Sequence, residues 1–199
     1  MKIFFICLIL ATAASCSVDF TRNTGTYYID GELGSDENHG NSPKKPWKSL
    51  SNVNNIDLPA SAILFKKGLV YQGTLKLDHR HSGDSTQTLQ IGTYGPESLL
   101  PPVIESGNES AIQLLKVNHA HISGLVLRGS GRKNGNTTSG LVVDSCRYVT
   151  IDSVEVSGYQ KSGINVLSSS HVRITNVLAH NNGHVGIKAG ASEGNQAMY

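Results

Sequence analysis

The chain is poor in cysteine, and this shortage excludes one way of stabilising an exported protein. Its 199 residues include 3 cysteines. Cys7 lies inside an apolar N-terminal run and Cys16 follows that run closely, so Cys146 alone remains in the region expected to fold. No disulfide framework is therefore available, and a buried apolar core has to hold the fold together.

The chain also has few charged residues, and neither sign dominates. Charged residues make up 16% of the sequence and the formal net charge is +2. Lysine and arginine are dispersed along the chain rather than clustered. Because a nucleic-acid surface needs a basic cluster, we expect no nucleic-acid partner.

A hydrophobic stretch long enough to cross a bilayer is missing as well. The apolar run Ile3–Ala11 is far shorter than the roughly 20 residues that a spanning helix needs. It follows a lysine and precedes small residues, which is the pattern of a signal peptide. We therefore interpret residues 1–15 as a signal peptide, residues 16–26 as a linker, and the protein as exported to the cell envelope or secreted.

The end of this segment, Ala-Ala-Ser-Cys-Ser at 13–17, resembles a bacterial lipobox. Cleavage there would make Cys16 the first residue and attach lipid to it. A plain small-residue cleavage site explains the same residues. We predict lipidation of Cys16, with membrane contact only through that anchor.

A repeat fills the C-terminal part of the chain. The triplets Ser139-Gly140-Leu141, Ser162-Gly163-Ile164 and Val185-Gly186-Ile187 recur at a spacing of 23 residues. An earlier unit matches at a spacing of 29, and its extra residues fall in the Gly-, Ser- and Asn-rich segment 129–138, which we interpret as a loop. A fixed period of this length is typical of solenoid proteins.

Each repeat unit contains three short runs in which apolar and polar residues alternate, for example 141–143, 148–151 and 154–156. This alternation predicts three strands per turn, and stacking the turns gives an all-β parallel β-helix. Only two residues separate the second and third runs, so the chain has to bend there within a dipeptide. The inward columns are then predicted to be Ile112, Leu141, Ile164 and Ile187; Ile122, Ile151 and Ile174; and Leu125, Val154 and Val177.

The N-terminal part departs from this pattern at Trp47–Ile56. Trp47, Leu50, Val53 and Ile56 follow at helical spacing. We expect a short helix that lies across the open end of the solenoid as a cap. The predicted β-helix domain is 27–199.

Three segments carry a resemblance to a known group of proteins. They are Tyr27-Tyr28-Ile29-Asp30, Gly34-Ser35-Asp36 and Pro46-Trp47-Lys48-Ser49-Leu50. Here the chain resembles bacterial right-handed β-helix proteins of the pectate-lyase-like superfamily. The resemblance implies a right-handed solenoid, but that superfamily includes lyases, hydrolases, epimerases and non-catalytic binders. We expect a polysaccharide partner and a lyase-like reaction on a uronate-containing glycan; a non-catalytic binding or structural β-helix is the alternative.

The resemblance also implies where a glycan binds, namely on the outward positions of the sheet that follows the Ser-Gly triplets and on the loops beside it. Lysine and arginine there could pair with uronate carboxylates, Tyr159 could stack on a sugar ring, and Asn or Gln could bind hydroxyl groups. The predicted substrate-binding residues are Gln113, Asn165, Arg132, Tyr159, Lys161 and Asn182.

A lyase needs a cation to stabilise an enolate and a base to remove a proton, and Lys188, Asp144 and His180 are the candidates. Lys188 could equally be a solvated strand lysine, and His180 a turn residue. A hydrolase needs two carboxylates on this face, where Asp144 is the only one in the predicted rows.

Calcium is a possible cofactor. Asp19, Asp30, Asp36 and Asn38 offer oxygen ligands, but without a defined ligand spacing. Turn formation explains the same residues equally well.

The last feature is the end of the sequence at Tyr199, after a single strand of a new turn. Either residues 190–199 fold across the open end, or the chain is truncated. We expect truncation, with further turns in a longer protein.

Overall fold

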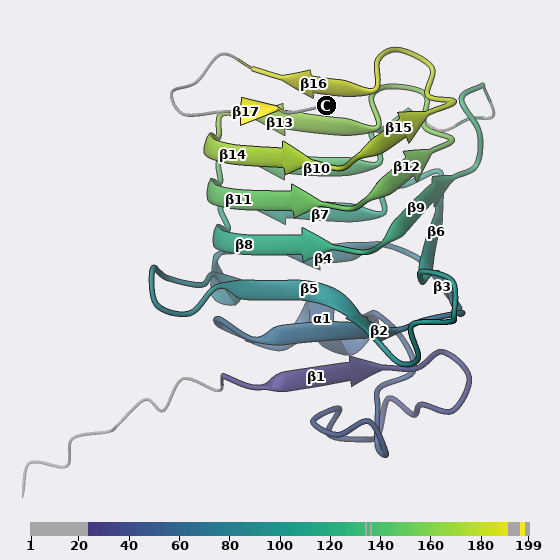
Figure 1. Ribbon diagram of the computed structural model, residues 1–199, viewed down its shortest axis with the longest axis vertical. Helices are drawn as coiled ribbons and strands as arrows, with labels where there is room; N and C mark the ends of the chain where they lie inside the picture. The colour runs from purple at the N-terminus through teal and green to yellow at the C-terminus, as the bar shows by residue number, and fades with distance from the viewer. Residues whose placement is uncertain (1–23, 134, 136, 191–195, 198–199) are drawn as a thin grey trace, which may run out of the picture.

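The computed structural model describes residues 24–133, 135, 137–190 and 196–197, and within them the chain forms three parallel sheets that stack turn upon turn (Figure 1). The predicted signal peptide, Cys16 and Asp19 lie outside the described residues. No helix in the described part is long and apolar enough to span a membrane.

Each full turn contributes one strand to each sheet. The first sheet contains β4 (Leu75–Leu77), β7 (Ile112–Leu115), β10 (Leu141–Asp144), β13 (Ile164–Leu167) and β16 (Ile187–Ala189). The second contains β1 (Thr26–Ile29), β2 (Ala62–Lys66), β5 (Leu89–Tyr94), β8 (Asn118–Ser123), β11 (Arg147–Asp152), β14 (Ser170–Thr175) and β17 (Gln196–Ala197). The third contains β3 (Val70–Gln72), β6 (Val103–Gly107), β9 (Val126–Gly129), β12 (Glu155–Ser157) and β15 (Leu178–His180).

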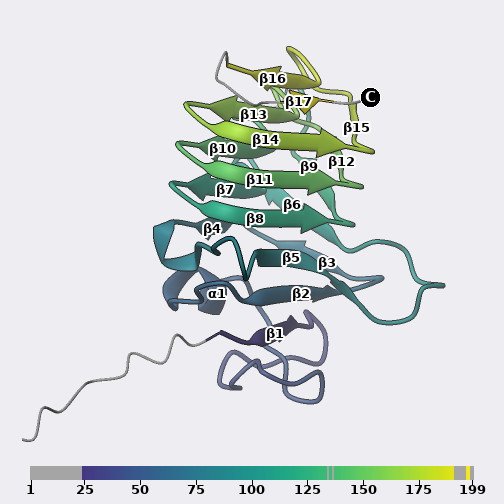
Figure 2. The same ribbon diagram turned by 60° about the vertical axis from the view of Figure 1, so that its left-hand side comes forward.

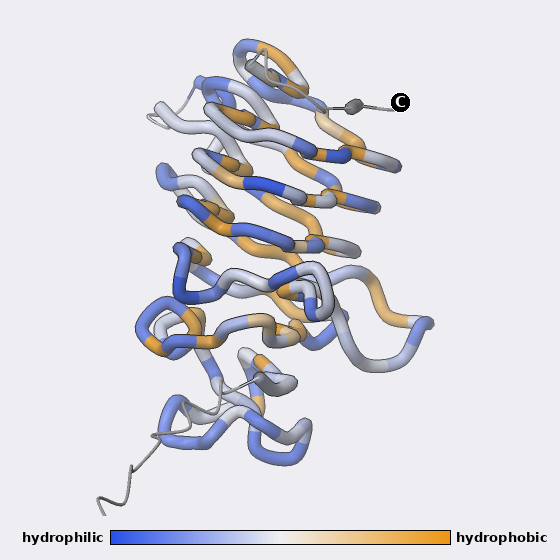
Figure 3. Tube along the Cα trace, turned by 90° about the vertical axis from the view of Figure 1, so that its left-hand side faces the viewer, coloured by the Kyte–Doolittle hydropathy of each residue, from blue (hydrophilic) through white to orange (hydrophobic). Residues whose placement is uncertain are grey.

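The strand register confirms the repeat. Leu141 pairs with Ile112 on one side and with Ile164 on the other, and Ile151 pairs with Ile122 and Ile174. These six side chains are buried. Figure 3 shows the resulting pattern, in which apolar segments recur at the same place on successive turns. The core is thus a set of apolar columns that run along the solenoid axis.

The predicted two-residue bends lie between the second and third sheets. Gly124, Ser153 and Asn176 occupy them with φ of 71°, 53° and 52°. Positive φ is the conformation that favours glycine and asparagine, which the sequence supplies in two of the three bends.

The N-terminal cap is shorter than predicted. Helix α1 covers only Ser51–Asn55 and packs against β4 (Figure 2), and Ile56 is extended. Trp47 is not helical, because its backbone forms a bridge to Ile29 of β1 and its ring stacks on Tyr27 with centroids 4.9 Å apart. Pairing with the edge strand β1 takes precedence over helical spacing here.

Candidate functional site

A cleft of about 530 Å³ lies where the outward face of the first sheet meets the loops that precede β13 and β16. Its walls are polar, as expected for a site that binds hydroxylated or charged ligands. The lining residues are Ser139, Gln160, Lys161, Ser162, Asn165, Gly183, His184 and Lys188.

Two outward residues of neighbouring turns form the floor of the cleft. Asn165 of β13 lies directly opposite Lys188 of β16. Stacked strands are about 4.8 Å apart, so both side chains can reach one ligand. The Oδ1 atom of Asn165 is buried and has no hydrogen-bond partner among the described residues. A buried acceptor without a partner is uncommon, and a ligand donor would satisfy it.

The charge of the cleft is positive. Lys161 and Lys188 are exposed, and neither forms an ion pair within the described part of the chain. His184 adds an exposed imidazole, and none of the described residues that line the cleft carries a carboxylate. This combination favours an anionic ligand.

The wall of the cleft is built by loops from successive turns that stack closely. The Lys161 N–H donates to the carbonyl of Thr138 at 3.1 Å, and the His184 N–H donates to the carbonyl of Lys161 at 3.1 Å. Gly183 is required at this contact, since a Cβ there would lie 2.2 Å from the Gln160 carbonyl oxygen. The backbone of three turns therefore positions Lys161 and His184.

Three of the predicted site residues come together in this cleft: Lys161, Asn165 and Lys188. Gln160 and His184 complete the lining together with the serines of two repeated Ser-Gly triplets, Ser139 and Ser162. The repeat marked those serines in the sequence, but it did not mark Gln160 as a wall residue.

The predicted role of Tyr159 as a stacking residue is wrong. Tyr159 is fully buried, and its hydroxyl lies 2.9 Å from Ser106 Oγ. Burial raises the pKa of the Tyr159 phenol to about 12. The ring fills the space next to Gly140, where a Cβ would lie 2.5 Å from it. Tyr159 is therefore part of the core.

Asn182 is also a structural residue. Its Oδ1 accepts the Tyr159 N–H at 3.1 Å, and its Nδ2 donates to the Val156 carbonyl at 3.2 Å. With both ends of the amide bound to backbone, Asn182 supports the wall of the cleft and is not among the lining residues.

The predicted catalytic residues do not form one group. Asp144 lies two turns before Lys188 and two residues farther along its strand, so their Cα atoms are about 12 Å apart by strand geometry. Its carboxylate accepts from Ser145 Oγ at 3.0 Å. His180 belongs to the third sheet, where its Nε2 lies 3.2 Å from Glu155 Oε1. Neither lines the cleft that contains Lys188.

Two further predicted residues lie outside the cleft. Gln113 shares the row of Asn165 but is two turns away, with Val142 between them. Arg132 is exposed on the inserted loop, and its side chain is not part of the lining.

The candidate calcium ligands Asp30, Asp36 and Asn38 form hydrogen bonds within the protein. The Asp30 carboxylate accepts from the N–H groups of Glu32 and Leu33 and pairs with Lys66 Nζ at 2.7 Å. Asp36 accepts from the N–H groups of Lys48 and Ser49. Within the described residues, no group of three or more His, Cys, Asp or Glu residues is placed to hold a metal ion.

Comparison with known proteins agrees with this architecture. Residues 110–198 match the family model described as "Right handed beta helix region". The chain is 27% identical over 150 residues to the lacto-N-biosidase of Bifidobacterium longum subsp. longum, an alignment that covers 74% of this chain and 9% of that protein.

Two solved structures share the fold. The GH136 lacto-N-biosidase from Eubacterium ramulus superposes with a TM-score of 0.52 at 16% identity, over 76% of this chain and 34% of that one. The alginate lyase from Paenibacillus sp. str. FPU-7 superposes with a TM-score of 0.51 at 16% identity, over 75% of this chain and 44% of that one.

The chain thus spans a small part of the curated relative and less than half of either solved structure. The comparisons and the three parallel sheets agree on the fold. The chain is a right-handed parallel β-helix repeat protein.

Proposed function

We propose that this chain is the β-helix part of an extracellular carbohydrate-active protein, and that the cleft on the first sheet binds an acidic glycan. One observation carries the proposal: within the described residues, two lysines that form no ion pair and an Asn165 Oδ1 without a hydrogen-bond partner line one cleft whose lining has no carboxylate. The relatives support the carbohydrate part of the proposal, since their names describe a lacto-N-biosidase and an alginate lyase.

The reaction that this set of residues supports best is β-elimination on a uronate. A lysine ammonium group can pair with the uronate carboxylate and stabilise the enolate that forms when the C5 proton leaves. His184 is the lining residue suited to accept that proton. The C4–C5 double bond then forms as the C4–O bond breaks, and the leaving oxygen takes a proton from solvent. Hydrolysis needs two carboxylates, which the lining residues do not supply.

The test is to incubate the full chain with uronate-containing and neutral polysaccharides, while following the ultraviolet absorbance of unsaturated products and, in parallel, binding by calorimetry. If only the uronate-containing polysaccharides bind and give unsaturated products, both the acidic-glycan site and the β-elimination are supported. Binding of uronates without product supports the alternative, a non-catalytic β-helix that binds polysaccharide. Absence of uronate binding, or release of reducing sugar from neutral glycans alone, contradicts the acidic-glycan site.

Export is a separate part of the proposal and rests on residues 1–16. If Cys16 carries lipid, fatty-acid labelling in the native host marks the protein, and Cys16→Ser abolishes both the label and membrane retention. Labelling that persists in Cys16→Ser contradicts the anchor.

A further inference from the structure

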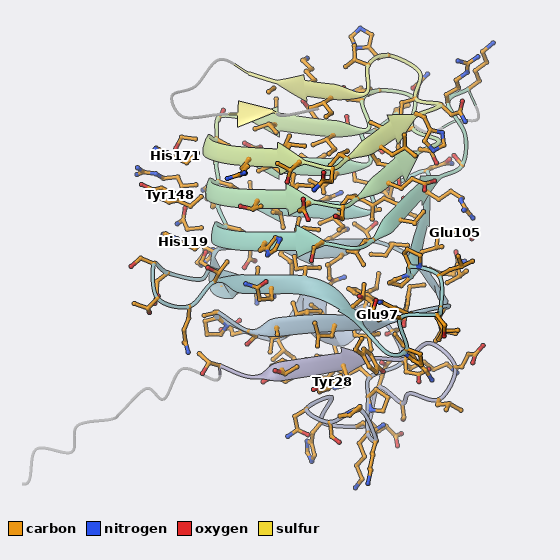
Figure 4. The ribbon with its side chains drawn as sticks, in the orientation of Figure 1. Tyr28, Glu97, Glu105, His119, Tyr148 and His171 are labelled. Atoms are coloured by element: carbon orange, nitrogen blue, oxygen red, sulfur yellow. The ribbon has the colours of Figure 1, made fainter. Side chains whose placement is uncertain are left out.

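Three ring side chains form a stack on the surface of the second sheet, away from the cleft. His119, Tyr148 and His171 occupy equivalent positions at the beginnings of β8, β11 and β14, one above the other (Figure 4). The Tyr148 ring lies 4.7 Å from the His119 ring and 4.6 Å from the His171 ring, centroid to centroid. Both faces of Tyr148 are therefore covered by imidazoles, although 44% of its surface is exposed.

The backbone under the stack has positive φ, as it does at several other corners of the solenoid. His119, Tyr148 and His171 have φ of 49°, 58° and 55°. A bulky residue at positive φ is strained, and glycine or asparagine would occupy these corners more easily. Because the rings are also at the surface, burial offsets little of this strain.

A pocket of about 330 Å³ lies beside the lower end of the stack, lined by His119, Tyr148, Arg147, Asn118, Gly83 and Asp84. The Arg147 guanidinium carbon is 5.7 Å from the centre of the Tyr148 ring. No ion pair within the described residues includes Arg147. The pocket shares no lining residue with the cleft on the first sheet.

The loop that carries Asp84 is tied to β8. The Gly83 N–H donates to the Asn118 carbonyl at 2.9 Å, and the Asn118 N–H donates to Ser82 Oγ at 3.1 Å. Asp84 Oδ1 accepts from Thr86 and Gln87 N–H groups at 2.8 and 3.0 Å. These bonds fix the Asp84 carboxylate within its loop, and Asp84 and Arg147 both line the pocket.

We propose that this pocket is a second saccharide-binding site, and that it takes a neutral sugar unit. The edges of the His119 and Tyr148 rings supply an apolar wall for the C–H groups of a sugar. Arg147 donates, Asp84 accepts and the Asn118 amide does both, which matches neighbouring hydroxyl groups that each donate and accept. With one cation and one anion, the pocket is formally neutral, whereas the cleft is cationic.

The experiment titrates the full chain with neutral tri- and tetrasaccharides of glucose, galactose and N-acetylhexosamine, and follows the histidine and tyrosine signals by nuclear magnetic resonance. At least one of these sugars binds and shifts the signals of His119 and Tyr148. Arg147→Gln and Asn118→Ala each weaken this binding tenfold or more. The matched control is Arg173→Gln, which removes an exposed arginine on the next strand of the same sheet, outside the pocket.

The variant Lys188→Gln distinguishes binding in this pocket from binding in the cleft. The site is supported if Lys188→Gln and added salt each change neutral-sugar affinity less than twofold, whatever becomes of acidic-glycan binding. It is overturned if none of the sugars binds, if Arg173→Gln weakens binding as much as Arg147→Gln, or if Lys188→Gln abolishes it. Inorganic sulfate that shifts the same signals with equal affinity also overturns it, because the pocket would then select charge alone.

Discussion

Asn182 Oδ1 accepts the backbone N–H of Tyr159 at 3.1 Å, across a separation of 23 residues that equals the repeat. The bond joins the loop before β16 to the loop before β13, which carries Lys161. The wall of the cleft is thus held by a side chain that the ligand need not touch.

We predict that Asn182→Ala destabilises the fold by about 1–3 kcal/mol, because it removes the acceptor of the Tyr159 N–H and the donor to the Val156 carbonyl. Denaturant-induced unfolding measures this loss. Gln160→Ala, an exposed neighbour, should change the free energy of unfolding by less than about 0.5 kcal/mol. Equal effects of the two changes would contradict the assigned role of Asn182.

The second prediction concerns the apolar core column of the second sheet. Ile151 is fully buried between Ile122 and Ile174, so Ile151→Ala should cost about 2–5 kcal/mol by opening a cavity, and Ile151→Val about 0.5–1.5 kcal/mol. Thermal and denaturant unfolding measure both. A cost below about 0.5 kcal/mol for Ile151→Ala would be incompatible with a close-packed column.

Lys188→Gln should weaken binding of a uronate oligosaccharide about tenfold while leaving the far-ultraviolet spectrum unchanged, because the side chain is exposed and contributes charge rather than packing. Binding to the unmodified protein should also weaken as salt rises. Lys76 is the matched control, since it occupies the same row of the first sheet but lies four strands away on β4. If Lys76→Gln has the same effect as Lys188→Gln, the ligand does not sit in the cleft.

Acid sensitivity should arise in part at the loop between β4 and β5. Hydrogen bonding to the Arg80 side chain, at 2.9 Å, lowers the pKa of Asp78 to about 2. A carboxyl whose pKa is lower in the folded state than in the unfolded state contributes stability above the unfolded value near 4, and that stability is lost as the pH falls from about 4 to 2.

Since the Asp78 side chain is about a third exposed, the contribution is on the order of 1 kcal/mol. Unfolding measured from pH 6 to pH 2 should show that Asp78→Asn is less stable than the unmodified protein at pH 6, and that the difference narrows toward pH 2. A constant difference across this range would contradict the linkage.

Much of the fold could be predicted from the sequence because a β-helix is periodic. The 23-residue spacing places Leu141 beside Ile164 and Asn165 beside Lys188, and a shift of one residue would turn every apolar side chain outward. The inward columns and the outward row follow from that single constraint. Three of the eight lining residues, Asn165, Lys188 and Lys161, could be predicted as site residues from the sequence, although their common cleft could not.

Only the tertiary structure decided where several side chains outside the regular strands lie. Tyr159 follows β12 in a polar loop, yet its ring turns inward because Gly140 of the previous turn leaves room for it. Trp47 has helical spacing, but its backbone pairs with Ile29 of β1 instead. His119, Tyr148 and His171 stack at corners where each backbone has a positive φ, which the strand pattern does not predict. The packing of loop side chains is set by contacts between successive turns that the sequence pattern does not specify, whereas the strands and the bends between them repeat and can be predicted.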